Sequence, residues 1–196
     1  IAGRSYVDYG LFATAVKRRA EDDDPVRTVL QLLEAGACGV KFFLGPTTGN
    51  IEAPGWGDLY RVGKEVSDRG AVLVFHCEDR DVIEQSEERE EGESSTDPAD
   101  YATLLDSRPR FGEMLATDGA LRLSLATGAR VHIAHVALAE AVEAIRWAKA
   151  QGGNVTSETC PQYLFLSDED YSRLGPVMKV LPPIRHVDDQ QALWQG

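Results

Sequence analysis

The sequence predicts an α/β fold in which helices cover a parallel sheet. Apolar runs rich in β-branched and aromatic residues alternate along the chain with polar stretches that carry apolar residues at helical spacing. A glycine follows each of these helical stretches, as expected of a left-handed cap before the next strand. Strands that alternate with helices of this length form βαβ units, and such units build parallel sheets.

The expected elements follow from this alternation. Strands are expected over residues 5–12, 39–44, 71–76, 130–136 and 154–158, and helices over residues 24–35, 58–69, 112–126 and 137–150. We interpret the Glu-rich segment 81–100 as a solvated excursion, and residues 161–185 as a long loop with a short helix at 167–174. A closed eight-stranded barrel typically needs about 250 residues, so these elements fit either an open sheet or part of a barrel.

Composition excludes several classes of protein. The 196 residues carry 32 acidic and 20 basic side chains, a net charge of −12 that disfavours binding to nucleic acid or to anionic lipid. No apolar run approaches the ~18–20 residues of a membrane helix, and residues 1–10 lack the pattern of a signal peptide. The three cysteines are far apart and form no CxxC pair, which indicates reduced thiols. We therefore expect a cytoplasmic protein with no nucleic-acid or membrane partner.

Lys41 is the most unusual residue of the predicted sheet. It interrupts the apolar run of residues 39–44, where a lysine buried between two helical layers would be costly unless it is paired or modified. A lysine near a strand end could reach a carboxylate or solvent. Alternatively, desolvation lowers the pKa of an amine, as required of a catalytic amine, a Schiff-base lysine or a carbamylated metal ligand.

Histidines end the next two predicted strands. His76 closes the run of residues 71–76, and Glu78 just beyond it either solvates the loop or contacts a histidine. His132 and His135 are three residues apart in one strand, so we expect their side chains to point to opposite faces. His135 is nearer the carboxyl end, where parallel α/β folds place their sites, whereas His186 follows in a loop and should be exposed. Lysine and two histidines on successive strands suit zinc or a similar divalent ion.

A set of motifs along nearly the whole chain resembles the cyclic amidohydrolases, the dihydroorotase, hydantoinase (dihydropyrimidinase) and allantoinase group of the amidohydrolase superfamily. Any one of these motifs alone is weak, but they occur together and in family order. The motifs are Ser-Tyr-Val-Asp-Tyr-Gly at 5–10, Gly-Val-Lys-Phe-Phe-Leu-Gly at 39–45, Val-Phe-His-Cys-Glu at 74–78, Ser-Arg-Pro at 107–109 with Glu113, Thr-Gly-Ala-Arg-Val-His-Ile-Ala-His at 127–135, Glu-Thr-Cys-Pro-Gln-Tyr-Leu at 158–164, Lys-Val-Leu-Pro-Pro-Ile-Arg at 179–185 and Ala-Leu-Trp at 192–194.

The resemblance implies a distorted (β/α)₈ barrel with a binuclear metal centre, most simply of Zn²⁺. Lys41 matches the lysine that is carboxylated and bridges the two metals, and His76 and His135 match two histidine ligands of the second metal. Two close cations activate water and polarise an amide carbonyl. Tyr163 and Arg185 match segments near the substrate loops and are candidate substrate-binding residues, although packing within the loop is an equal alternative.

The chain also departs from the family pattern. The His-x-His motif of the first barrel strand and the aspartate of the last strand are absent from the sequence, so no residue is assigned as catalytic. We expect residues 1–196 to form one domain, the central part of a partial barrel with about strands three to seven. We further expect the isolated chain to be inactive, and open sheet edges to favour association of copies into a homo-oligomer.

The resemblance implies a hydrolase of the C–N bond in a small cyclic amide. Dihydroorotase, which converts dihydroorotate to N-carbamoyl-aspartate, ranks first because residues 45–50 are nearest to that group. Hydantoinase or dihydropyrimidinase and allantoinase are the alternatives, favoured by Leu181, which stands where dihydroorotases usually carry asparagine. A non-catalytic amidohydrolase-like scaffold and an open-sheet binding protein without metal are alternatives of another class. Metal analysis separates the enzyme from both.

Overall fold

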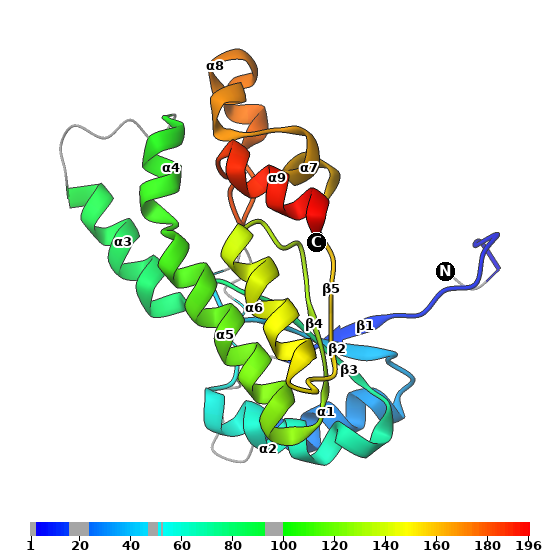
Figure 1. Ribbon diagram of the computed structural model, residues 1–196. Helices are drawn as coiled ribbons and strands as arrows, with labels where there is room; N and C mark the ends of the chain where they lie inside the picture. The colour runs from blue at the N-terminus through cyan, green and yellow to red at the C-terminus, as the bar shows by residue number, and fades with distance from the viewer. Residues whose placement is uncertain (1–2, 16–23, 47–50, 52, 93–99) are drawn as a thin grey trace.

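Five parallel strands form one sheet whose spatial order, β1-β2-β3-β4-β5, equals their order along the chain. The strands are β1 (Phe12–Thr14), β2 (Gly39–Phe43), β3 (Val72–His76), β4 (Arg130–Ile133) and β5 (Val155–Ser157). The computed structural model describes residues 3–15, 24–46, 51, 53–92 and 100–196 (Figure 1). Sequential parallel pairing confirms the predicted α/β fold of repeated βαβ units.

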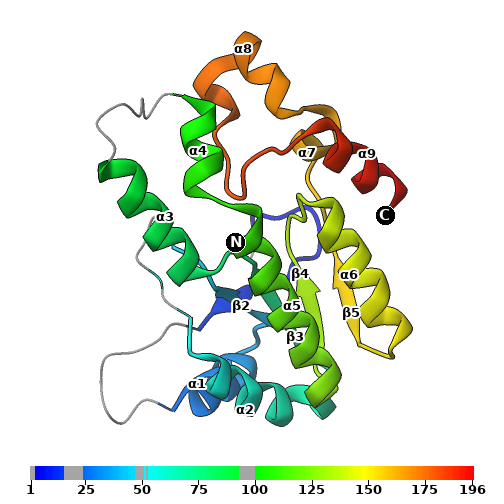
Figure 2. The same cartoon turned by 60° about the vertical axis from the view of Figure 1, so that its left-hand side comes forward.

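Helices and short 3₁₀ turns connect and extend the strands. The helices are α1 (Pro25–Glu34), α2 (Trp56–Val66), α3 (Arg80–Gly92), α4 (Tyr101–Ser107), α5 (Arg110–Thr127), α6 (Ala139–Ala150), α7 (Pro161–Phe165), α8 (Tyr171–Leu174) and α9 (Val187–Gln195), and the 3₁₀ turns are η1 (Ser67–Arg69), η2 (Asp168–Asp170) and η3 (Gly175–Met178). Figures 1 and 2 show α7, α8 and α9 grouped beyond the carboxyl end of the sheet. None of the described helices has the length and apolar character needed to cross a membrane.

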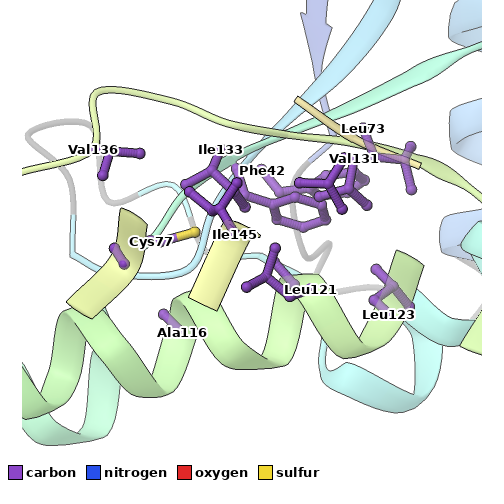
Figure 3. Close-up of a cluster of buried hydrophobic side chains, with 14 of the residues drawn as sticks. Phe42, Leu73, Cys77, Ala116, Leu121, Leu123, Val131, Ile133, Val136 and Ile145 are labelled. Carbon is purple, nitrogen blue, oxygen red and sulfur yellow. The ribbon is translucent and has the colours of Figure 1, made fainter. Parts of the chain in front are cut away.

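The two faces of the sheet differ in composition and burial. The outer face packs against the helices, and its side chains, all buried, are Val40, Phe42, Leu73, Phe75, Val131, Ile133 and Val155. Figure 3 shows several of them packed with Leu121 and Leu123 of α5 and Ile145 of α6. Residues of the opposite parity form the inner face, and the strand register aligns Lys41, Val74, His132 and Thr156 in one row across it, with Phe43 and His76 one level higher.

The predicted left-handed caps are confirmed. Gly36, Gly70, Gly128 and Gly152 follow α1, η1, α5 and α6, and all have positive φ. A residue with a Cβ would be strained at these positions, so the glycines end each helix before the chain turns into the next strand.

Two predicted segments were wrong. The first strand begins at Phe12 rather than at residue 5, because only Phe12–Thr14 lie in register with β2, while Tyr6 and Val7 are exposed. The excursion predicted over 81–100 contains most of helix α3, whose only large apolar residues are Val82 and the fully buried Ile83. Asp79 accepts a hydrogen bond from the Val82 amide in the first turn of the helix. Residues 93–99 of that segment lie outside the described residues. Helix α9, which follows the predicted long loop, was not anticipated.

Candidate metal centre

Lys41 lies on the inner face of β2, with Thr14 of β1 and Val74 of β3 beside it in register. Its side chain is half-buried, and its Nζ lies 5.3 Å from the centre of the Phe43 ring. Burial lowers the pKa of the Lys41 amine, while the nearby Cys77 and Glu158 act in the opposite direction. A partly desolvated amine is closer to the neutral form, which is the form that reacts with carbon dioxide.

His76 and His135 meet at the carboxyl ends of β3 and β4. The distance between His76 Nδ1 and His135 Nε2 is 3.0 Å, and the ring centres are 4.8 Å apart in an edge-to-face arrangement. Burial, together with the charges of His76 and Lys41, lowers the pKa of His135 to about 3. A neutral imidazole at physiological pH is the form that binds a metal ion.

The structure corrects the prediction that only one of His132 and His135 can face the site. Strand alternation ends at Ile133, and His135 lies beyond the strand with a φ of 42°. This left-handed conformation is rare for a residue with a side chain, and it breaks the parity that the prediction assumed. As a result His135 reaches His76 on the inner face, and His132 lies on that face as well, where its Nδ1 is 2.8 Å from Thr156 Oγ1.

Glu78 links the histidine pair to a buried ionic cluster. Its Oε2 lies 2.8 Å from His76 Nε2 and 3.3 Å from Arg108 Nη1. A second buried pair joins Arg185 Nη2 to Glu113 Oε2 at 3.1 Å, and Arg185 Nη1 also donates to the Arg108 carbonyl. From the sequence, Glu78 had two possible roles, and Arg108 and Glu113 had none. Glu78 and Arg108 are 30 residues apart in sequence, and Glu113 and Arg185 are 72 residues apart, so no local pattern reveals these pairs.

The candidate substrate-binding residues have protein partners. Tyr163 is buried, and its hydroxyl donates to the Pro182 carbonyl at 2.7 Å. Arg185 is buried beside Glu113. These contacts favour the packing alternative, in which both residues hold the 182–185 segment, and a direct contact with substrate stays a prediction.

The histidine pair and Lys41 fit part of a metal site. Two imidazole nitrogens face each other from adjacent strand ends, and one nitrogen, His135 Nδ1, is buried with no hydrogen-bond partner among the described residues. Within the described residues, no group of three or more His, Cys, Asp or Glu side chains comes together in a way that could hold a metal ion. Lys41 as a third ligand, in a modified, oxygen-bearing form, stays a prediction.

Comparison with known proteins gives a consistent result. No family model matches the chain. The chain is 35% identical over 195 residues to an allantoinase of Enterococcus faecalis, covering 96% of this chain and 41% of that protein. It is 31% identical over 193 residues to an L-hydantoinase of Paenarthrobacter aurescens, covering 98% of this chain and 40% of the relative.

The solved structures agree with the sequences. The L-hydantoinase (dihydropyrimidinase) of Arthrobacter aurescens superposes with a TM-score of 0.84 at 30% identity, over 96% of this chain and 40% of that one. The five-stranded sheet and its helices therefore correspond to part of a (β/α)₈ barrel. The chain spans about two fifths of the length of the relatives it matches. From its sequence and its fold, the chain belongs to the cyclic amidohydrolases of the amidohydrolase superfamily.

Proposed function

We propose that this protein is a metal-dependent hydrolase that opens the C–N bond of a small cyclic ureide, with allantoin and hydantoins as the first candidate substrates. The observation that carries the proposal is the pair of imidazoles, His76 Nδ1 and His135 Nε2, which face each other 3.0 Å apart on the same face of the sheet as Lys41. The names of the similar proteins, an allantoinase and an L-hydantoinase, support the choice of substrates. In this proposal residues 1–196 act as one domain that supplies the central strands of a barrel.

His76, His135 and a carboxylated Lys41 would hold the metal, which we propose to be Zn²⁺ in a binuclear centre. When bound, such ions polarise a carbonyl group and lower the pKa of water. The chain's own residues prepare this site in two ways. Burial lowers the pKa of His135 and so keeps its imidazole neutral, and the inner face carries Lys41 on the same side of the sheet as His76.

We assign the substrate side of the site to the loops at the carboxyl end of the sheet. Tyr163 and Arg185 contribute to this side of the site indirectly, by holding the 182–185 segment in place. Tyr163 donates to the Pro182 carbonyl, and Arg185 donates to the Arg108 carbonyl and to Glu113.

Dihydroorotase is the second candidate. It is favoured by the sequence of residues 45–50, of which 47–50 lie outside the described residues. Leu181 disfavours it, since an aliphatic side chain offers no hydrogen bond to a carboxylated ring. Relative rates on dihydroorotate and on allantoin distinguish the two candidates.

The experiment combines metal analysis with a substrate panel. The purified protein, supplied with Zn²⁺ and bicarbonate, is assayed on allantoin, hydantoin, dihydrouracil and dihydroorotate, and its bound metal is measured by mass spectrometry. We expect bound Zn²⁺ and turnover of a ureide, both lost in Lys41→Ala. Bound metal without turnover of any ring would favour the non-catalytic scaffold, and absence of both would contradict the proposal.

A further inference from the structure

We propose that Glu78 is the positioning residue of this centre, which fixes the proton of His76 on Nε2 and turns Nδ1 toward His135. The inference rests on the proposed metal site, but its first part concerns the metal-free protein. Glu78 is only 1% exposed, and its carboxylate meets the imidazole from the side opposite to His135.

The hydrogen-bond chemistry determines where the proton lies. A carboxylate accepts hydrogen bonds and cannot donate them, so the 2.8 Å contact with Glu78 Oε2 requires a proton on His76 Nε2. In that tautomer Nδ1 carries a lone pair. This lone pair faces His135 Nε2 at 3.0 Å, the position from which an imidazole binds a metal ion.

The partner histidine supports the same reading. If His135 donates its Nε2 proton to His76, then His135 Nδ1 is a bare acceptor, buried and without a partner. If His135 carries its proton on Nδ1 instead, two lone pairs face each other. A cation shared by the two nitrogens satisfies both of them at once.

Glu78 is itself held from several sides. Arg108 Nη1 lies on the same carboxylate oxygen at 3.3 Å, and Arg108 Nη2 also donates to Glu87. The backbone of Glu78 packs closely against the loop after β2, where a Cβ added at Gly45 would lie 2.8 Å from the Glu78 carbonyl oxygen. These contacts restrict the carboxylate to the orientation in which it reaches His76.

The chain offers a matched control in Glu113. Glu113 is also buried, at 3% exposed, and is also paired with an arginine, but its side chain contacts Arg185 where Glu78 contacts a histidine. Glu78→Gln and Glu113→Gln each replace the carboxyl group of a buried carboxyl–arginine pair by an amide of the same shape. A general loss of stability should therefore follow from both variants, while an effect on His76 should follow only from the first.

The experiment measures the tautomer and the metal separately. Imidazole nitrogen NMR of the ¹⁵N-histidine-labelled, metal-free protein should show His76 protonated on Nε2 in the wild type and in Glu113→Gln, and a mixture of tautomers in Glu78→Gln. Competition with a chromogenic chelator should show that Glu78→Gln weakens Zn²⁺ binding by about 10- to 100-fold, the usual cost of losing such a contact. Glu113→Gln should leave Zn²⁺ affinity within a few-fold of the wild type, and circular dichroism verifies that both variants are folded.

The outcomes separate this inference from the proposed function. A wild-type His76 protonated on Nδ1, or equal losses of Zn²⁺ affinity in the two variants, would overturn the role of Glu78. A tautomer change confined to Glu78→Gln in a protein that binds no Zn²⁺ would support the role of Glu78 and refute the metal centre.

Discussion

The two faces of the sheet use the same strands for different purposes. On the outer face, Phe42 and Phe75 stack with ring centres 5.3 Å apart under the helices and are fully buried. On the inner face, the neighbouring positions along β2 and β3 are Lys41 and His76. Because strand side chains alternate, one run of apolar residues can supply a core on one side and chemistry on the other.

The difference shows where stability and function are separable. A large side chain removed from the outer face leaves a cavity that the packed helices cannot fill. The inner-face residues Lys41 and Val74 lie outside that core, so removing a side chain there disturbs it less. Substitutions on the outer face should therefore mainly lower the free energy of unfolding, and substitutions on the inner face should mainly lower metal binding and activity.

The largest effect is expected from the two histidines of the candidate metal centre. His76→Ala or His135→Ala should reduce bound Zn²⁺ and hydrolysis by more than the roughly 10- to 100-fold that an outer contact costs, because each removes a metal ligand. Metal analysis and steady-state assays measure both effects. His186→Ala is the control, since His186 is exposed at the start of α9. Equal losses in all three variants would contradict the assignment.

On the outer face, Phe75→Ala should lower the free energy of unfolding by about 3–5 kcal/mol, because it removes a fully buried ring that stacks on Phe42. Chemical denaturation measures the loss. The folded fraction should still bind Zn²⁺ with wild-type stoichiometry, in contrast to the histidine variants. A loss below about 1 kcal/mol would mean that the core tolerates the cavity and that the two faces are less distinct than proposed.

Glu113 provides a pH-dependent test at the edge of the core. Burial raises its pKa from 4.5 to about 7, although Arg185 opposes the shift. A raised folded-state pKa means that the folded protein retains a proton which the unfolded chain has lost. Its contribution to stability is therefore present below about pH 4.5 and is lost as the pH rises through about 7.

Glu113→Gln removes this titration. Relative to the variant, the wild type should lose roughly 3 kcal/mol of unfolding free energy between pH 4.5 and pH 8, at about 1.4 kcal/mol for each pKa unit. Denaturation curves of both proteins at several pH values provide the difference. A difference that is constant with pH would show that Arg185 keeps Glu113 ionised throughout.

The smallest effect is expected from His132, which lies on the inner face one register level below His76. His132→Ala should cost about 0.5–1.5 kcal/mol of stability through loss of its contact with Thr156, and change Zn²⁺ affinity by less than about 10-fold. The same denaturation and competition measurements apply. A loss of metal as large as in His135→Ala would place His132 among the ligands.

The fold and the position of the site were predictable from the sequence where local patterns decide them. The runs around Lys41 and His76 are almost continuously apolar, so strands β2 and β3 were located closely, and glycine marked the helix ends. Helix α3 was missed because only Ile83 of its fully described side chains is deeply buried. Its apolar pattern is therefore too weak to stand out from that of a solvated loop.

Contacts between distant parts of the chain were harder to predict from the sequence. The orientation of His135 depends on a single residue with positive φ, which no apolar pattern reports. Glu78 meets Arg108 only once the end of α4 packs against the loop after β3, and Glu113 meets Arg185 only once α5 packs against the 182–185 segment. The candidate ligands were therefore predictable from the sequence, and a contact of Glu78 with a histidine was one of two alternatives, whereas the arginine partners of Glu78 and Glu113 were not predictable.

The close approach of Gly45 to Glu78 ties the loop after β2 to the loop after β3. Arg80 strengthens this connection, because its Nη2 donates to the carbonyls of Gly45 and Ile51 from the start of α3. The start of the loop that follows Lys41 is thus in close contact with Glu78, the residue that we propose orients His76. Variation that reshapes this loop to admit a different ring would also displace the histidine, so ring preference and metal affinity would change together during evolution rather than independently.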